Sequence, residues 1–524
     1  LSNTQTRTVN SELKFEDLYN KWKFLRAVYN SAPSPANKNN NAAVGNKKTD
    51  KTSNNSKSDT TSKRQVAKLK DPNQLPQIGD VPKFFIKILT SLKRAGIQYT
   101  EDFGTSLPGY LDSTNFMGFN AKSGQPGFAY VFGYQPDTNW INRFGAKGLL
   151  SHDSLVSSMI QQRYNQRVNI TAQVSPYRHF NIDINLDKTF DKQYSELYKD
   201  TSAFDNVGLT RLNPYALGSF NVSYISYQTL FKKFDPNQIS ETFSQFESNR
   251  LLLSGKLAGL NPYQVGGTNL DGYYKGYGRY AQDVVIPSFL AAYTHKDPFS
   301  IKPISNGNPN IRSNPFSGII PKPNWAVTYN GLSRLKGLDK IFTNVTIRHG
   351  YHSTLSMNSF NTALLFTDPL RVGYPLFKDP LTGNFIPYFL VPNITIQEAF
   401  DPLFEIDMTF TNQLTTRFEY KKSRQLSLSL IDYQLAESRS TEVTFGFNWR
   451  QKGMPIIKKI GKMKLENDVT FKMDFSLRDD ATANSKLDQG TSFGTSGQKV
   501  IRIAPSVDYV LNNRVSLKFY FDQT

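Results

Sequence analysis

The sequence contains no cysteine among its 524 residues. A disulfide framework, a thiolate zinc site and a cysteine nucleophile are therefore excluded. It also lacks any run of about 18 apolar residues, which is the length that a transmembrane helix needs. The most apolar stretches, 84–89 and 284–293, are too short to cross a bilayer. A membrane protein that crosses with strands stays open, because such strands are short and only half apolar.

Catalytic patterns are absent as well. The segment GYYKGYGRY, residues 272–280, resembles a phosphate loop but lacks the GKS/T ending and the strand-to-helix context. His349 and His352 are three residues apart in a strand pattern, so they face opposite sides and cannot share a metal. No GxSxG elbow is present. We therefore expect no enzyme, no cofactor and no metal site.

Acidic residues are too few to balance the basic ones. The chain has 62 Lys and Arg against 43 Asp and Glu, a formal net charge of +19. Such an excess is typical of nucleic-acid binding when the cations cluster. Here they are spread through the whole sequence, and no recognition helix, RNP motif or zinc finger accompanies them. We expect a solvated basic surface and no nucleic-acid partner.

Aromatic residues are abundant, with 38 Phe and 27 Tyr, although the mean hydropathy is only -0.48. A soluble protein must bury so many rings in a core. A membrane barrel can instead turn them towards lipid and into interfacial girdles. The N-terminal residues Leu1-Ser-Asn-Thr4 show neither an initiator Met nor a signal peptide. The sequence therefore reads as part of a longer chain.

The first 80 residues differ from the rest. Apolar residues recur every two to four positions in residues 11–30, which predicts an amphipathic helix. Residues 32–75 are rich in Asn, Ser, Lys, Thr and Pro and nearly free of large apolar side chains. Such a segment cannot bury enough surface to offset its ordering entropy. We expect residues 1–80 to form a helix followed by a disordered polar loop.

Residues 81–524 are expected to form strands with insertions. Thr343–Ser359 alternates for far longer than the usual five or six residues of a strand, which suits a tilted membrane-crossing strand. One-sided alternation recurs at 168–174, 180–186, 404–411, 414–430, 443–449, 469–477, 501–509 and 515–521. A soluble sandwich would also alternate. Strand length, and charges opposite nearly every apolar position, favour a membrane barrel.

The connections support the same reading. Tight turns are expected at 411–413 and 512–513, and longer polar loops at 431–440 and 479–498, as in barrels with short periplasmic turns and long outer loops. The region 197–340 is irregular and plug-like, with a helix expected over 236–255. The predicted fold is all-β, part of a very large antiparallel transmembrane β-barrel with loop and helical insertions.

The alternation also assigns faces. The apolar parity should see lipid, and the polar parity should line the lumen. The expected lumen-facing residues are Arg348, Arg417, Glu419, Lys472 and Asp474. The expected lipid-facing residues are Ile347, Phe418, Phe471 and Phe475.

Several segments resemble one family in order and spacing. They are GTSLPGY (104–110), PGFAYVFG (126–133), WAVTYNGL (325–332), HGYHST (349–354) and EYKKSRQLSL (419–428). From about residue 80 onward the sequence resembles the C-terminal part of the SprA/Sov family, the outer-membrane translocon of the type IX secretion system. We expect this chain alone not to close a barrel, since the family's N-terminal part and a closing strand are not in the sequence.

The resemblance implies a location and partners. The family lies in the outer membrane of Gram-negative bacteria and exports folded cargo proteins from the periplasm to the cell surface. Implied partners are a small lipid-associated β-barrel that covers a lateral opening, a periplasmic plug protein, cargo with a C-terminal targeting domain, and outer-membrane lipid. Two other readings stay open at this point, an energy-coupled nutrient receptor and a soluble β-rich adhesin.

Overall fold

One antiparallel sheet dominates the computed structural model, with 51% of the chain in strands and 15% in helices. The sheet has 14 strands and runs from β1 at one edge to β14 at the other. This confirms the all-β antiparallel class. The structure describes the whole chain except residues 23–24, 26–85, 87–89, 154, 203–207, 305–309, 455–467 and 513–514.

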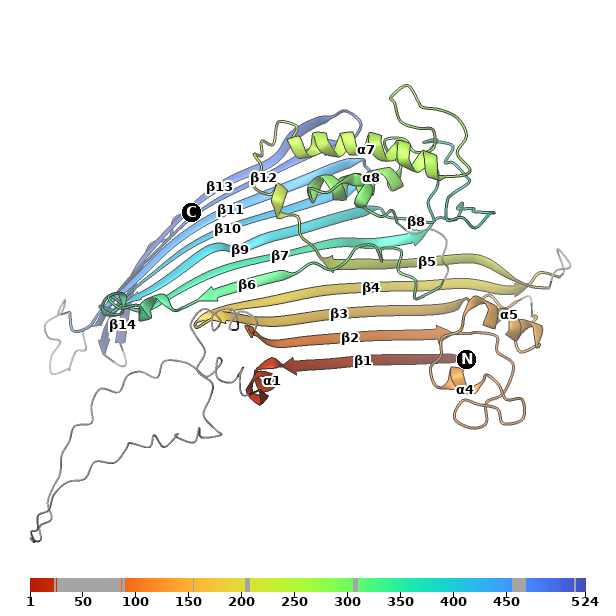
Figure 1. The fold of residues 1–524 in the computed structure, drawn as a ribbon, viewed down its shortest axis with the longest axis horizontal. Helices are drawn as coiled ribbons and strands as arrows, with labels where there is room; N and C mark the ends of the chain where they lie inside the picture. The colour runs from red at the N-terminus through yellow and green to blue at the C-terminus, as the bar shows by residue number, and fades with distance from the viewer. Residues whose placement is uncertain are drawn as a thin grey trace, which may run out of the picture.

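Strand order follows chain order along the sheet (Figure 1). The short strands are the exceptions: β6 pairs with β4 and β7, β8 pairs with β7, and β5 therefore pairs with β7. The long strands are β1 (Ser2–Lys14), β2 (Leu92–Ser106), β3 (Ile160–Tyr177), β4 (Phe180–Asp200), β5 (Leu209–Ser223), β7 (Phe342–Thr362), β9 (Asn393–Phe410), β10 (Leu414–Ser429), β11 (Gln434–Gln451), β12 (Asp468–Lys486) and β13 (Thr491–Asn512). Three strands are short: β6 (Asn324–Tyr329), β8 (Phe389–Leu390) and β14 (Val515–Tyr520). The strand β6 pairs with β4 at residues 180–185 and with β7, whereas β5 pairs with β4 further along, at residues 188–200.

The two ends of the strands differ in their connections. The turn end carries the tight turns 178–179 and 411–413, together with α1 (Phe15–Lys21), η3 (Leu332–Arg334) and η4 (Leu338–Lys340). The insertion end carries two long helical insertions, which contain α4 (Phe128–Val131), α5 (Thr138–Ala146), η1 (Tyr227–Thr229), α7 (Glu241–Leu260), α8 (Gln282–Tyr293) and η2 (Pro298–Ser300). Length alone does not separate the two ends, because the turn end also has the links 15–91 and 452–467, and the insertion end also has the four-residue turns 430–433 and 487–490.

Helices α7 and α8 lie over one half of the sheet, near the insertion end (Figure 1). The α7 N-terminus is capped by the Ser240 hydroxyl, which accepts a hydrogen bond from the Phe243 backbone amide. Phe246 of α7 meets Phe289 of α8 edge to face, with ring centroids 6.2 Å apart. Both rings belong to the main core, which includes Leu355, Ile396 and Leu428 of the sheet. In the described part of the chain, no helix is long and apolar enough to span a bilayer.

Several predicted elements need correction. The helix expected over 11–30 is wrong at its start, because residues up to Lys14 pair with β2 and the helix α1 begins at Phe15. Backbone bonds to a neighbouring strand outweigh the helical spacing there. The helix expected over 236–255 is present as α7, which begins and ends five residues later, at Glu241–Leu260. The polar segment 32–75 lies outside the described residues.

Two expected loops are also wrong. Most of the segments 431–440 and 479–498 continues the strands β10 to β13, and only four residues join each pair. The irregular region 197–340 includes the end of β4, β5 and β6. Polar strand residues mimic a loop when hydroxyl and amide side chains fill one face.

Candidate functional site: the two faces of the sheet

The strand β10 shows how the two faces of the sheet are divided. Its register with β11 runs without a break from Leu414↔Trp449 to Ser429↔Gln434, so alternate residues point to opposite faces along its whole length. Leu426 and Leu428 are fully buried in the core beneath the helices. Phe418 has the same parity as these leucines, whereas Arg417 has the opposite parity. We call the two surfaces the apolar face and the polar face.

The apolar face is covered only near the insertion end. There the segment that contains α7 and α8 packs on it and buries the main core. Towards the turn end the same face is uncovered, and we call this part the bare band. Ten of its large apolar side chains are 37% to 57% exposed, namely Val9, Leu13, Ile97, Phe404, Phe445, Trp449, Leu477, Ile501, Val515 and Leu517. At the turn end Val469 and Tyr509 form a small buried cluster.

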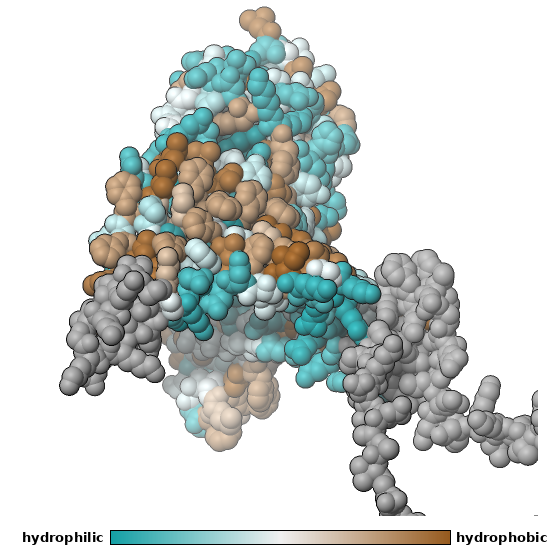
Figure 2. All heavy atoms as spheres, turned by 90° about the vertical axis from the view of Figure 1, so that its left-hand side faces the viewer, coloured by the Kyte–Doolittle hydropathy of each residue, from teal (hydrophilic) through white to brown (hydrophobic). Residues whose placement is uncertain are grey.

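The height of the bare band can be worked out from the strands. In β12 the exposed and half-buried part of this face runs from Phe471 to Leu477, and in β10 it runs from Leu414 to Tyr420. At a rise of about 3.4 Å per residue each segment spans about 20 Å along the strand. Barrels of the outer membrane carry an apolar outer band about 25 Å tall. Seen from the turn end, hydrophobic side chains gather in one broad region with hydrophilic ones beside it (Figure 2).

Aromatic pairs lie at the edge of the bare band nearest the turn end. The rings of Phe342 and Phe410 are 4.7 Å apart, and those of Phe180 and Tyr329 are 6.0 Å apart. Trp449 stacks on Phe471 at 5.8 Å. Rows of aromatic side chains at this position are typical of barrels that cross a membrane, because such rings suit the lipid headgroup level.

The polar face carries a network of ion pairs opposite the bare band. Arg348 binds Glu405 at 2.8 Å and Asp407 at 2.5 Å. Arg417 binds Glu405 at 3.2 Å and Glu419 at 3.1 Å. The structure therefore brings three of the five expected lumen-facing residues together, across β7, β9 and β10. Sequence reasoning left Glu405 and Asp407 out of this set, although their parity in 404–411 was the available signal.

The other two expected residues lie further along the same face. Lys472 pairs with Asp508 of β13 at 3.0 Å. Asp474 lies opposite Gly446 in the register of β11 and β12. The polar parity thus carries charges of both signs from β7 to β13, with most cations beside a carboxylate.

The apolar residues expected to face lipid share the other parity. Ile347 pairs with Ile406, and Phe418 lies between Ile406 and Phe445. Phe471 and Phe475 lie in the bare band of β12, and Phe475 pairs with Phe445. All four residues expected to face lipid therefore lie on the face opposite the ion-pair network.

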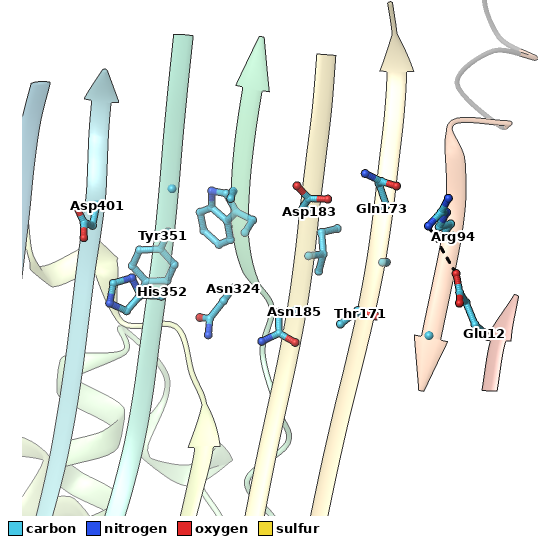
Figure 3. Close-up of a pocket in the computed structure, with 16 residues that line it drawn as sticks. Glu12, Arg94, Thr171, Gln173, Asp183, Asn185, Asn324, Tyr351, His352 and Asp401 are labelled. Carbon is cyan, nitrogen blue, oxygen red and sulfur yellow. Dashed lines mark ion pairs between the residues drawn. The ribbon is translucent and has the colours of Figure 1, made fainter. Parts of the chain in front are cut away.

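A hollow on the polar face lies towards the β1 edge (Figure 3). It crosses from Glu12 on β1 to Asp401 on β9, and Glu12 lies 3.9 Å from Arg94. Amide and hydroxyl side chains fill the space between the charges. His352 lines this hollow, whereas His349 packs beside Trp325 on the apolar face. Among the residues that the structure describes, no group of three His, Asp or Glu could hold a metal ion.

Comparison with known proteins does not identify the chain: no protein-family model and no curated protein matches it. The resemblance to the SprA/Sov family therefore remains a prediction from the sequence motifs.

Proposed function

We propose that the chain forms part of the wall of a very large outer-membrane β-barrel that exports folded proteins to the cell surface, as in type IX secretion. One observation carries the proposal: a bare apolar band that spans about 20 Å along the strands lies directly behind a polar face of paired charges. Water disfavours such a band, whereas the hydrocarbon of a bilayer accepts it. The polar face would then line the lumen.

The polar face suits the passage of a folded protein. The ion pairs of Arg348, Arg417 and Glu419 keep this wall hydrated, and they offer a passing surface no continuous apolar patch. Charges of both signs also prevent strong attraction to cargo of either net charge. The helices α7 and α8 pack on the apolar face, so they do not occupy the space in front of Arg417.

The connections support an orientation. Short turns lie at the periplasmic end in barrels of this kind, and longer segments lie outside. We infer that the turn end faces the periplasm and that the helices stand above the outer leaflet, from the tight turns 178–179 and 411–413 and from the helical insertions at the other end. The links 15–91 and 452–467 at the turn end do not follow this rule. The family's partners, a small barrel, a periplasmic plug protein and cargo with a targeting domain, belong to the proposal through the resemblance alone.

An energy-coupled nutrient receptor fits the described residues less well. Such a receptor needs a plug inside its barrel, whereas α7 and α8 lie on the opposite side of the sheet from the ion-pair network. A soluble adhesin would expose the bare band to water and would stay in solution without detergent. Recovery of the intact protein in the outer-membrane fraction, and only with detergent, would separate a membrane barrel from an adhesin.

Adjacent residues of β10 allow a sharp test of export. A photo-crosslinking side chain at Arg417 is expected to trap cargo when export is stalled, and one at Phe418 is not. The two sites lie at the same depth on opposite faces, so each controls for the other. Cargo adducts at neither Arg417, Arg348 nor Lys472 under a verified stall would refute export while leaving the membrane location intact.

A further inference from the structure

The upper edge of the bare band, where the helical layer begins, is built from aromatic rings in edge-to-face and tilted contact. Tyr227 of η1 contacts Tyr351 at 5.4 Å and Phe400 at 6.0 Å, and Phe231 contacts Phe400 at 5.5 Å. Tyr224 precedes η1: its backbone amide donates to the Ser353 carbonyl of β7 at 3.0 Å, and its ring packs in the main core. We call these five rings the aromatic margin. Phe231 is half exposed, so the margin reaches the surface.

Two lysines place their ammonium groups over these rings. Lys422 Nζ lies 5.0 Å from the centroid of Phe231, and Lys296 Nζ lies 5.3 Å from that of Tyr224. Within the described part of the chain, neither lysine has an ion pair with a carboxylate. Each long side chain thus covers an aromatic surface while its charge stays available at the edge.

Two buried carboxylates of the apolar face are already engaged. Glu398 binds Arg424, and Glu437 binds Arg439 at 2.7 Å and Arg424 at 3.8 Å. Among the described residues, Lys422 therefore has no carboxylate partner on this face. On the loop beside it, Lys232 is paired with Glu241 at 3.1 Å, so Lys422 and Lys296 are the lysines over these aromatic rings whose charge is not paired.

We propose that the aromatic margin binds the phosphate groups of an anionic lipid headgroup, with Lys422 and Lys296 as the two phosphate ligands. Aromatic belts lie at the headgroup level of membranes, and lysines there attract anionic lipid. This inference rests on the proposed function, because the margin lies at headgroup level only if the bare band lies in hydrocarbon. In the orientation argued above, the lipid belongs to the outer leaflet.

The test uses the intact protein in phosphatidylcholine vesicles that contain a minor fraction of diphosphorylated lipid A. After mild solubilisation and gel filtration, the lipid A retained per protein is measured. Each Lys→Gln change at 296 or 422 should weaken retention about fivefold at low ionic strength, and the double variant on the order of thirtyfold. Dephosphorylated lipid A should bind poorly, and excess inorganic phosphate should not displace the lipid.

Lys378 provides a matched control. Its ammonium lies 4.7 Å from the Phe385 ring, but this pair lies at the insertion end, away from the margin. Lys378→Gln should retain lipid A like the unmodified protein. A double Lys→Arg variant at 296 and 422 should also retain it, which excludes misfolding as the cause of a loss.

The proposal is overturned if the double Gln variant keeps full retention, if dephosphorylated lipid A binds equally well, or if Lys378→Gln loses as much. Displacement by inorganic phosphate would show a general anion site and would overturn the lipid assignment. Failure of the unmodified protein to enter vesicles at all would instead refute the membrane location.

Discussion

Arginine substitutions along one strand should reveal whether the bare band lies in a membrane. The band of β12 contains Phe471, Met473, Phe475 and Leu477, all of one parity, whereas Val469 is buried against Tyr509 and is left out of the series. Leu477 lies about 13 Å from Met473, and Phe471 and Phe475 lie about 7 Å from it on either side. In a bilayer, an arginine on the lipid face costs about 2–4 kcal/mol at the midplane and about 0–1 kcal/mol near the interfaces.

The expected result is therefore a cost that is highest at Met473→Arg and clearly smaller at Leu477→Arg. Each site is compared with its own alanine variant, because the native side chains differ in size and packing. Lys472→Arg, on the polar face beside Asp508, should cost little. The free energy of unfolding would be measured by denaturant titration of the protein inserted in vesicles.

A flat profile would refute the reasoning. If the band were exposed to water, arginine at these positions would change the stability by only about 0.5 kcal/mol, as at most surface sites. A high cost at every position, including Leu477, would instead point to a protein partner that covers the whole band. The shape of the profile, not its mean, separates these cases.

Three further outcomes are expected. Glu405→Gln removes a carboxylate shared by Arg348 and Arg417. Since both arginines are about half exposed, the denaturation midpoint should fall by the equivalent of about 1–2 kcal/mol. An unchanged midpoint would contradict a stabilising role of these ion pairs. Burial raises the pKa of Asp283 to about 7, so the folded protein binds this proton more tightly than the unfolded chain does. The free energy of unfolding should therefore fall as the pH rises from about 4 to 7, and Asp283→Asn should abolish this slope in thermal melts across that range. Deletion of residues 34–70 should leave assembly intact, because the segment is polar and loop closure depends weakly on length; loss of the assembled band on a gel would show that the segment carries structure.

The faces of the strands were predictable, because a period of two is a local property. The alternation in 414–430 and 469–477 places Phe418 and Phe471 opposite Arg417 and Lys472, as the registers show. The ion pairs were not predictable. Arg348 and Asp407 are separated by 59 residues and meet only through the register of β7 with β9, which a single sequence does not reveal.

The errors share a physical cause. Residues 11–14 have helical spacing, yet β2 offers them a full set of backbone hydrogen bonds, which decides their conformation. The segments 431–440 and 479–498 look like loops because Ser, Thr and Asp fill the polar parity. Their other parity holds Leu435 and Ala483, which are buried under the helices. Two small or isolated apolar residues do not produce a visible alternation in the sequence when the large apolar residues of the same strand lie in another part of it.

Strand length explains why the helices lie where they do. A strand of about 20 residues, such as β4, is about 70 Å long, whereas hydrocarbon accounts for about 25–30 Å. In the proposed membrane barrel, much of each long strand would therefore stand in water, where its apolar face needs a protein cover. The insertion with α7 and α8 supplies that cover by placing Phe246 and Phe289 against the sheet near the insertion end. The bare band has the same apolar alternation without such a cover. A soluble sheet needs a layer over both halves, and a membrane sheet needs one only over the half outside the lipid.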